Sequence, residues 1–173
     1  MKAIVLAVLL AACLIPLAAM PAAAAPAQLY NKSVVIAWSE SIQERNEAGQ
    51  VLNTSLSRER IAYISSAGRV FVRATQSSRY AQKKNELAPG AAPGTLAFQG
   101  NSLVGTAVFA GFARRITVTF DGSFSSCSAS VVYGKAGGPQ KWKSLDGKQT
   151  MEVQSISASS ASCSIREGNL VAN

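Results

Sequence analysis

A tryptophan flanked by two lysines, Lys141-Trp142-Lys143, is the local sequence that most suggests ligand binding. An indole ring stacks on a sugar face or lies at a membrane interface, while neighbouring ammonium groups meet phosphates or carboxylates. The triplet lies in a stretch rich in glycine and lysine, residues 134–147, which we expect to be a loop. The alternative is structural: Trp142 closes one end of the fold and both lysines stay in water.

A second candidate surface is the alternating segment that contains Arg69, Phe71 and Arg73. In a strand, these three side chains point to one face and the apolar residues between them point to the other. A phenylalanine exposed between two arginines suits a binding face. The alternative is that these arginines are edge-strand charges that prevent sheet-to-sheet aggregation. Arginines expected on neighbouring strands are candidates to extend the face: Arg58, Arg60, Arg114 and Arg115.

The charge of the chain indicates the kind of partner it attracts. The sequence has 17 lysine and arginine residues against 9 aspartate and glutamate residues. An exported cation of this kind collects at anionic surfaces such as lipopolysaccharide, teichoic acid, phospholipid headgroups or acidic polysaccharide. Nucleic acid fits the same electrostatics but is a poorer match for an exported protein. The alternative is a basic protein without a dedicated anionic partner, because net charge also serves solubility.

Most catalytic arrangements are missing from the sequence. It contains no histidine, so the usual triads and Cys-His pairs are excluded, and no Ser-x-x-Lys or Gly-x-Ser-x-Gly motif occurs. Paired carboxylates could support glycoside hydrolysis, but we expect the acidic cluster to be solvated surface. This cluster consists of Glu40, Glu44, Glu47 and Glu59. We therefore predict no catalytic residue, no cofactor and no metal site.

The amino terminus resembles a secretory signal peptide spanning residues 1–24. Lys2 precedes an apolar run, and Ala22 and Ala24 give the small-x-small pattern read by signal peptidase. A transmembrane anchor is disfavoured because prolines interrupt the run, so no span is expected in the mature chain. A lipoprotein anchored through Cys13 is the other alternative. Residues 25–173 then form one exported domain, in the periplasm or outside the cell.

Export also determines the role of the cysteines. Without Cys13, Cys127 and Cys163 remain, and two cysteines in an oxidising compartment allow one pairing. A reactive thiol pair is the alternative, but neither cysteine lies in a Cys-x-x-Cys motif or beside a cluster of positive charge. We therefore predict a structural disulfide between Cys127 and Cys163.

The elements that must position these residues are short strands separated by turns. We expect a polar hairpin tip at residues 40–50 and a long proline- and glycine-rich loop at residues 77–94. The fold class is therefore all-β, as a single antiparallel β-sandwich or an up-and-down β-barrel with one disulfide. The strands are expected at residues 30–38, 58–65, 69–74, 103–109, 114–120, 128–133, 151–156 and 162–165.

These features favour an exported, non-enzymatic module that binds an anionic or carbohydrate ligand of the cell envelope. A structural or protein-interaction subunit, or an inhibitor, is the alternative function. A glycoside hydrolase that depends on carboxylates is the third.

Overall fold

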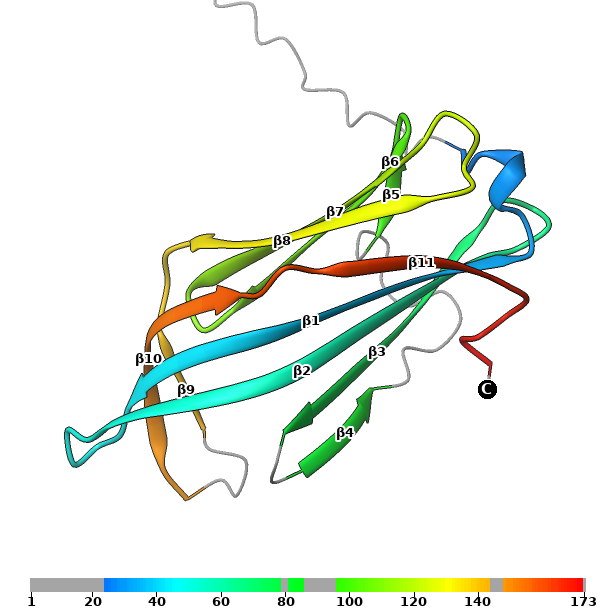
Figure 1. Cartoon of the computed structure of the whole chain (residues 1–173). Helices are drawn as coiled ribbons and strands as arrows, with labels where there is room; N and C mark the ends of the chain where they lie inside the picture. Colours follow the sequence, from blue (N-terminus) through cyan, green and yellow to red (C-terminus); the bar gives the residue numbers. More distant parts are fainter. Residues whose placement is uncertain (1–23, 79–80, 86–95, 144–147, 173) are drawn as a thin grey trace, which may run out of the picture.

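The chain folds into β-strands, as Figure 1 shows in a computed structural model. The structure describes residues 24–78, 81–85, 96–143 and 148–172. Within these ranges it contains eleven strands in two antiparallel sheets and one short 3-10 helix, η1 (Ala27–Leu29), but no α-helix. The predicted all-β antiparallel class is confirmed.

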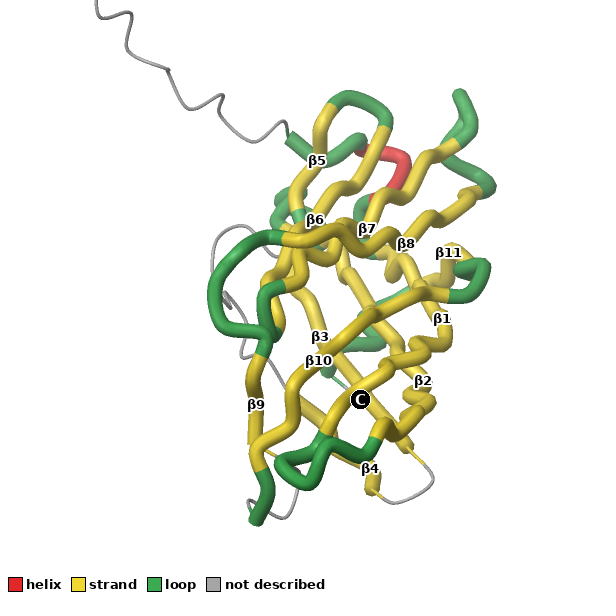
Figure 2. Tube along the Cα trace, turned by 90° about the vertical axis from the view of Figure 1, so that its left-hand side faces the viewer, coloured by secondary structure: helices red, strands yellow, loops and turns green. Residues whose placement is uncertain are grey.

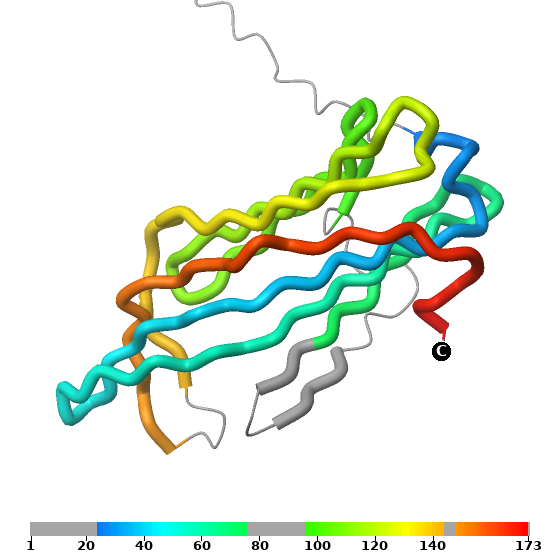
Figure 3. Tube along the Cα trace, in the orientation of Figure 1, coloured from blue at the N-terminus to red at the C-terminus, as the bar shows by residue number. Residues whose placement is uncertain are grey.

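The larger sheet has the strand order β4-β3-β2-β1-β10-β9, with β11 also paired to β1. Strand β1 is its centre, because β2 pairs with it along its whole length on one side while β11 and β10 share the other side. Figure 3 shows β10 and β11 following one another beside β1. The bounds are β1 (Lys32–Arg45), β2 (Val51–Ile64), β3 (Val70–Ser78), β4 (Ala81–Asn85), β9 (Lys141–Lys143), β10 (Thr150–Ala158) and β11 (Ser162–Glu167).

The smaller sheet has the strand order β5-β6-β7-β8. Alternation in β7, within the strand expected at 114–120, buries Ile116, Val118 and Phe120 and turns Arg115 and Thr119 to solvent. Its strands are β5 (Ala97–Gln99), β6 (Ser102–Phe109), β7 (Phe112–Phe120) and β8 (Cys127–Lys135).

The two sheets pack across a shared hydrophobic core. Val34 and Ile36 of β1 belong to the same buried cluster as Leu103, Val118 and Phe120 of the smaller sheet. Because β1 pairs with β10 and β11 as well as with β2, the strand order is not that of an up-and-down barrel. The arrangement is sandwich-like, and Figure 2 shows it from the side.

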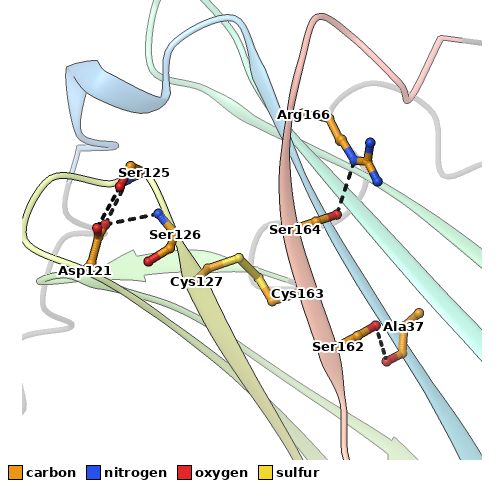
Figure 4. The surroundings of a disulfide bond; sticks show 9 residues. All are labelled: Ala37, Asp121, Ser125, Ser126, Cys127, Ser162, Cys163, Ser164 and Arg166. Atoms are coloured by element: carbon orange, nitrogen blue, oxygen red, sulfur yellow. Dashed lines mark hydrogen bonds between the residues drawn. A yellow bond between two sulfur atoms is a disulfide. The ribbon is translucent and has the colours of Figure 1, made fainter.

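The predicted disulfide is confirmed and joins the two sheets. Cys127 begins β8 and Cys163 lies in β11, with 5.7 Å between their Cα atoms (Figure 4). A β-bridge between Ala129 and Ala161 lies close by along the chain. Together these links close one edge of the sandwich.

Three predicted loops are shorter than expected. Strand β1 continues to Arg45, so the hairpin tip covers residues 46–50 instead of 40–50. Strand β9 pairs with β10 inside the predicted loop at 134–147. Strand β4 pairs with β3 inside the predicted loop at 77–94. In each case a neighbouring strand satisfies the backbone of a segment whose composition suggests a loop.

The predicted signal peptide falls on residues that the structure does not describe, apart from Ala24. The remainder of the predicted 77–94 loop, at 79–80 and 86–94, also lies outside the described residues. In the part of the chain that is described, no helix is long and apolar enough to cross a membrane.

Candidate functional site

Strand alternation in β9 separates Trp142 from the lysines that flank it. Lys141 and Lys143 are exposed, whereas Trp142 is half-buried and faces the second, smaller hydrophobic cluster. Its indole Nε1–H group donates a hydrogen bond of 2.8 Å to Glu44 Oε2. Its ring also meets Phe109 edge to face, with 5.6 Å between the ring centroids. The indole is therefore held in place while both ammonium groups remain in water.

The end of β6 adds the ring of Phe109 beside Trp142. Gly111 adopts a positive φ of 76°, and a Cβ atom there would lie 2.9 Å from the side chain of Gln140. This close approach brings the turn against the segment before β9. Phe109 is 40% exposed at the end of β6, and its neighbour Val108, which is 69% exposed, points to the opposite face of the strand.

We call Phe109, Lys141, Trp142 and Lys143 together the amphiphilic end. It combines two partly exposed aromatic side chains with two exposed cations at one end of the sandwich. Acidic residues lie near Lys141: it pairs in register with Glu152, and both line a shallow pocket of about 230 Å³ with Glu47. The sequence identifies the Lys-Trp-Lys triplet but not Phe109, which the turn brings to it.

A charged layer crosses the interior of the sandwich. Its centre is Glu40, which is only 2% exposed. The Glu40 carboxylate accepts hydrogen bonds from Arg58 Nε at 2.6 Å and from Arg114 Nη1 at 3.4 Å, and from the hydroxyl of Tyr133. The indole of Trp38 donates a fourth, at 3.1 Å. These four donors come from β1, β2, β7 and β8 and converge on one buried carboxylate.

Arg60 and Arg114 complete this layer beside Trp38. Their guanidinium carbons lie 5.9 Å and 5.5 Å from the centroid of the indole ring, which is cation–π geometry. Burial, together with the positive charges of Arg114 and Arg58, lowers the pKa of Arg60 to about 10. The Nε atom of Arg114 is buried without a hydrogen-bond partner among the described residues. We use the name charged layer for Trp38, Glu40, Arg58, Arg60, Arg114 and Tyr133.

The prediction that Glu40 and Glu44 are solvated surface is wrong. Glu44 is 3% exposed and accepts hydrogen bonds from Thr54 at 2.9 Å and from Trp142 at 2.8 Å. Both carboxylates continue the inward positions of β1, where partners on other strands satisfy them. Glu40 and Glu44 lie roughly 13 Å apart along β1, which is further than the separation of the two catalytic carboxyl groups in a glycoside hydrolase. Glu47 is exposed at the hairpin tip, as predicted.

Arg69, Phe71 and Arg73 lie on the outer face of the larger sheet, opposite buried Val72 and Ala74. Arg69 lies 5.6 Å from the Phe71 ring centroid. Arg73 donates a hydrogen bond of 3.3 Å to the carbonyl of Val171 near the C-terminus. A groove of about 590 Å³ runs beside it, lined by Val35, Glu59, Ile61, Arg73, Ser164, Arg166, Glu167 and Leu170.

The proposed extension of this face is wrong for all four arginines. Arg58 and Arg60 are inward residues of β2, because they pair in register with the buried residues Trp38 and Ile36 of β1. Arg114 faces them from β7. Arg115 is exposed on the outer face of the other sheet. Alternation distinguishes inward from outward residues within one strand. Only the strand pairing shows which faces of different strands lie on the same side of the sandwich.

The fold and these sites define a class: an antiparallel all-β domain, closed at one edge by a disulfide, with a charged layer inside and an amphiphilic end. No protein-family model, curated protein or solved structure matches the chain.

Proposed function

We propose that this chain is an exported, non-enzymatic binding domain that docks on anionic lipid headgroups of the cell envelope through its amphiphilic end. The observation that carries the proposal is the position of Phe109, which is 40% exposed and packs on Trp142 at the end of the fold where Lys141 and Lys143 are exposed. The net charge of +8 for the whole chain favours approach to any anionic surface.

The residue types at the amphiphilic end favour a lipid surface over a soluble polysaccharide. A partly exposed phenylalanine gains free energy when its ring leaves water and enters the boundary between headgroups and acyl chains. Each lysine near an anionic surface contributes about 1 kcal/mol. Two lysines with two partly exposed apolar side chains therefore support weak, reversible binding that depends on salt.

Sedimentation with lipid vesicles tests the proposal. We expect binding to phosphatidylcholine vesicles that contain phosphatidylglycerol, little binding to pure phosphatidylcholine, and release between about 50 and 500 mM NaCl. The double variant Lys141→Ala/Lys143→Ala should bind roughly 30-fold more weakly and lose most of the salt dependence. Phe109→Ala should weaken binding but leave the salt dependence unchanged, because it removes an apolar contact.

Arg166→Ala is the matched control, because Arg166 is an exposed cation on β11, away from the amphiphilic end. It should bind vesicles nearly as the natural protein does. Equal losses in Arg166→Ala and in the double lysine variant would contradict the proposal, since net charge alone would then account for binding. Retention on an acidic polysaccharide without retention on vesicles would also contradict it.

A protein-interaction role is the second candidate function, and the outer groove beside Arg73 favours it. Two arginines and two glutamates, Arg73, Arg166, Glu59 and Glu167, surround apolar lining residues there. That pattern suits an extended peptide segment with charges of both signs. A photoreactive residue at Leu170 should cross-link such a partner in cells, and the absence of any adduct would count against this role.

A further inference from the structure

The charged layer holds more positive charge than its central carboxylate neutralises. Arg58 has the short ion pair with Glu40, at 2.6 Å, whereas the contact from Arg114 is longer, at 3.4 Å. Arg60 donates to the backbone carbonyl of Glu59 at 3.2 Å, which carries no net charge. Two guanidinium groups beside Trp38 therefore lie close to a carboxylate that is already bound by a third.

We propose that Arg60 and Arg114 form a binding site for a small oxyanion, a carboxylate, phosphate or sulfate group, at the charged layer. This site is separate from the amphiphilic end and does not depend on the function proposed above. Its ligand class follows from the donors: guanidinium groups bind planar or tetrahedral oxyanions through paired N–H groups.

The donors suit such a ligand. The buried Nε–H group of Arg114 has no partner among the described residues, which leaves an unmet donor at the site. The indole of Trp38 lies beside both guanidinium groups and restricts their orientation. Repulsion from Arg58 and Arg114 acts on Arg60, and an anion between them would relieve it.

The arginine side chains of the proposed site are also more exposed to solvent than the Glu40 carboxylate. The side chain of Arg114 is 14% exposed, whereas that of Glu40 is 1% exposed. Arg60 is also partly exposed. The guanidinium groups of Arg60 and Arg114 are thus more accessible to a small anion than the carboxylate, which Arg58 and Tyr133 hold by hydrogen bonds. The charged layer therefore has three guanidinium groups and one carboxylate, and an external oxyanion would supply a further negative charge.

Calorimetric titration and thermal unfolding of the whole exported chain test this site. Inorganic phosphate or sulfate should bind with one-to-one stoichiometry and should raise Tm, relative to chloride at the same ionic strength. At 100 times the dissociation constant, the rise should be about 5 to 10 °C. Arg60→Met and Arg114→Met should each lose this response. Methionine keeps much of the apolar volume of the arginine stem while removing the charge.

Arg115→Met is the matched control, because Arg115 follows Arg114 in β7 but points to solvent. It should respond to phosphate as the natural protein does. Equal stabilisation of the natural protein, Arg60→Met and Arg115→Met would overturn the proposal, since the effect would then be a general salt effect. Absence of saturable phosphate and sulfate binding to the natural protein would overturn it too, even if the variants fail to fold.

The same variants identify the source of the oxyanion. If Arg60→Met loses the phosphate response but binds phosphatidylglycerol vesicles normally, the site takes a free anion. If it loses both, the site takes a headgroup phosphate. Either result supports the site. Loss of vesicle binding in the double variant Lys141→Ala/Lys143→Ala, with the phosphate response intact, would separate this site from the amphiphilic end.

Discussion

The guanidinium Nε–H group of Arg58 donates to Oε2 of Glu40 across the pair of strands β2 and β1, over 2.6 Å. The side chain of Glu40 is 1% exposed and that of Arg58 is 13% exposed. A carboxylate buried this deeply stays ionised only when donors replace its water. Arg58 forms the shorter of the two ion pairs with Glu40 and is therefore its main cationic partner.

Removing Arg58 should strongly destabilise the fold. Arg58→Met leaves Glu40 buried without its short ion pair, and breaking one partner of a buried pair costs about 3 to 5 kcal/mol. Urea unfolding followed by circular dichroism measures this loss. A change of less than about 1 kcal/mol would show that Arg58 contributes little to holding Glu40.

Removing Arg60, in contrast, should not destabilise the fold. Burial and two neighbouring arginines lower its pKa, so its charged form is disfavoured in the folded state. We expect Arg60→Met to unfold at the same urea concentration as the natural protein or at a higher one, in buffer without phosphate or sulfate. A loss as large as that of Arg58→Met would mean that Arg60 is a required member of the ion cluster.

The contribution of Tyr133 to the free energy of unfolding should decrease at alkaline pH. Burial and its hydrogen bond to Glu40 raise the pKa of Tyr133 to about 12, from an ordinary value of 10.0. Above pH 10 the unfolded chain releases this proton first, so the stabilisation is complete below pH 10 and is lost as pH approaches 12.

The variant Tyr133→Phe isolates this effect. The difference in unfolding free energy between the natural protein and Tyr133→Phe should shrink between pH 10 and 12, by on the order of 2 kcal/mol. Arg60 titrates in the opposite direction over the same range but is present in both proteins. A difference that stays constant with pH would contradict the hydrogen bond between Tyr133 and Glu40.

The disulfide should contribute to stability through the loop it closes. Its cysteines are 36 residues apart, and the chain-entropy relation gives about 3 to 4 kcal/mol for such a loop. The double variant Cys127→Ala/Cys163→Ala should lose stability of this size. The natural protein should also show no free thiol from these residues in Ellman's assay without reductant, whereas two free thiols would contradict the bond.

Strand alternation explains why much of the fold could be predicted from the sequence. Val34 and Ile36 are inward residues of β1, and Ile116, Val118 and Phe120 are inward residues of β7. The two cysteines could be paired because the sequence leaves one combination after Cys13 is assigned to the leader. Periodicity and counting suffice in these cases, since neither requires knowledge of strand order.

The charged layer could not be predicted in the same way. Glu40 and Glu44 continue the inward alternation of Ile36, Trp38 and Ile42, which is a signal in the sequence that their polarity obscures. Their burial becomes favourable only when other strands bring donors to them, including Arg114 and Trp142 from far along the chain. That information lies in strand order and not in local composition.

The central claim is that the amphiphilic end contacts lipid, and quenching of tryptophan fluorescence by brominated acyl chains tests it most directly. Trp142 lies at that end, whereas Trp38 is 4% exposed in the interior. Phosphatidylglycerol vesicles with brominated chains should quench the natural protein, and Trp142→Phe should lose most of that quenching while still binding. Unchanged fluorescence in protein that demonstrably sediments with the vesicles would contradict the claim.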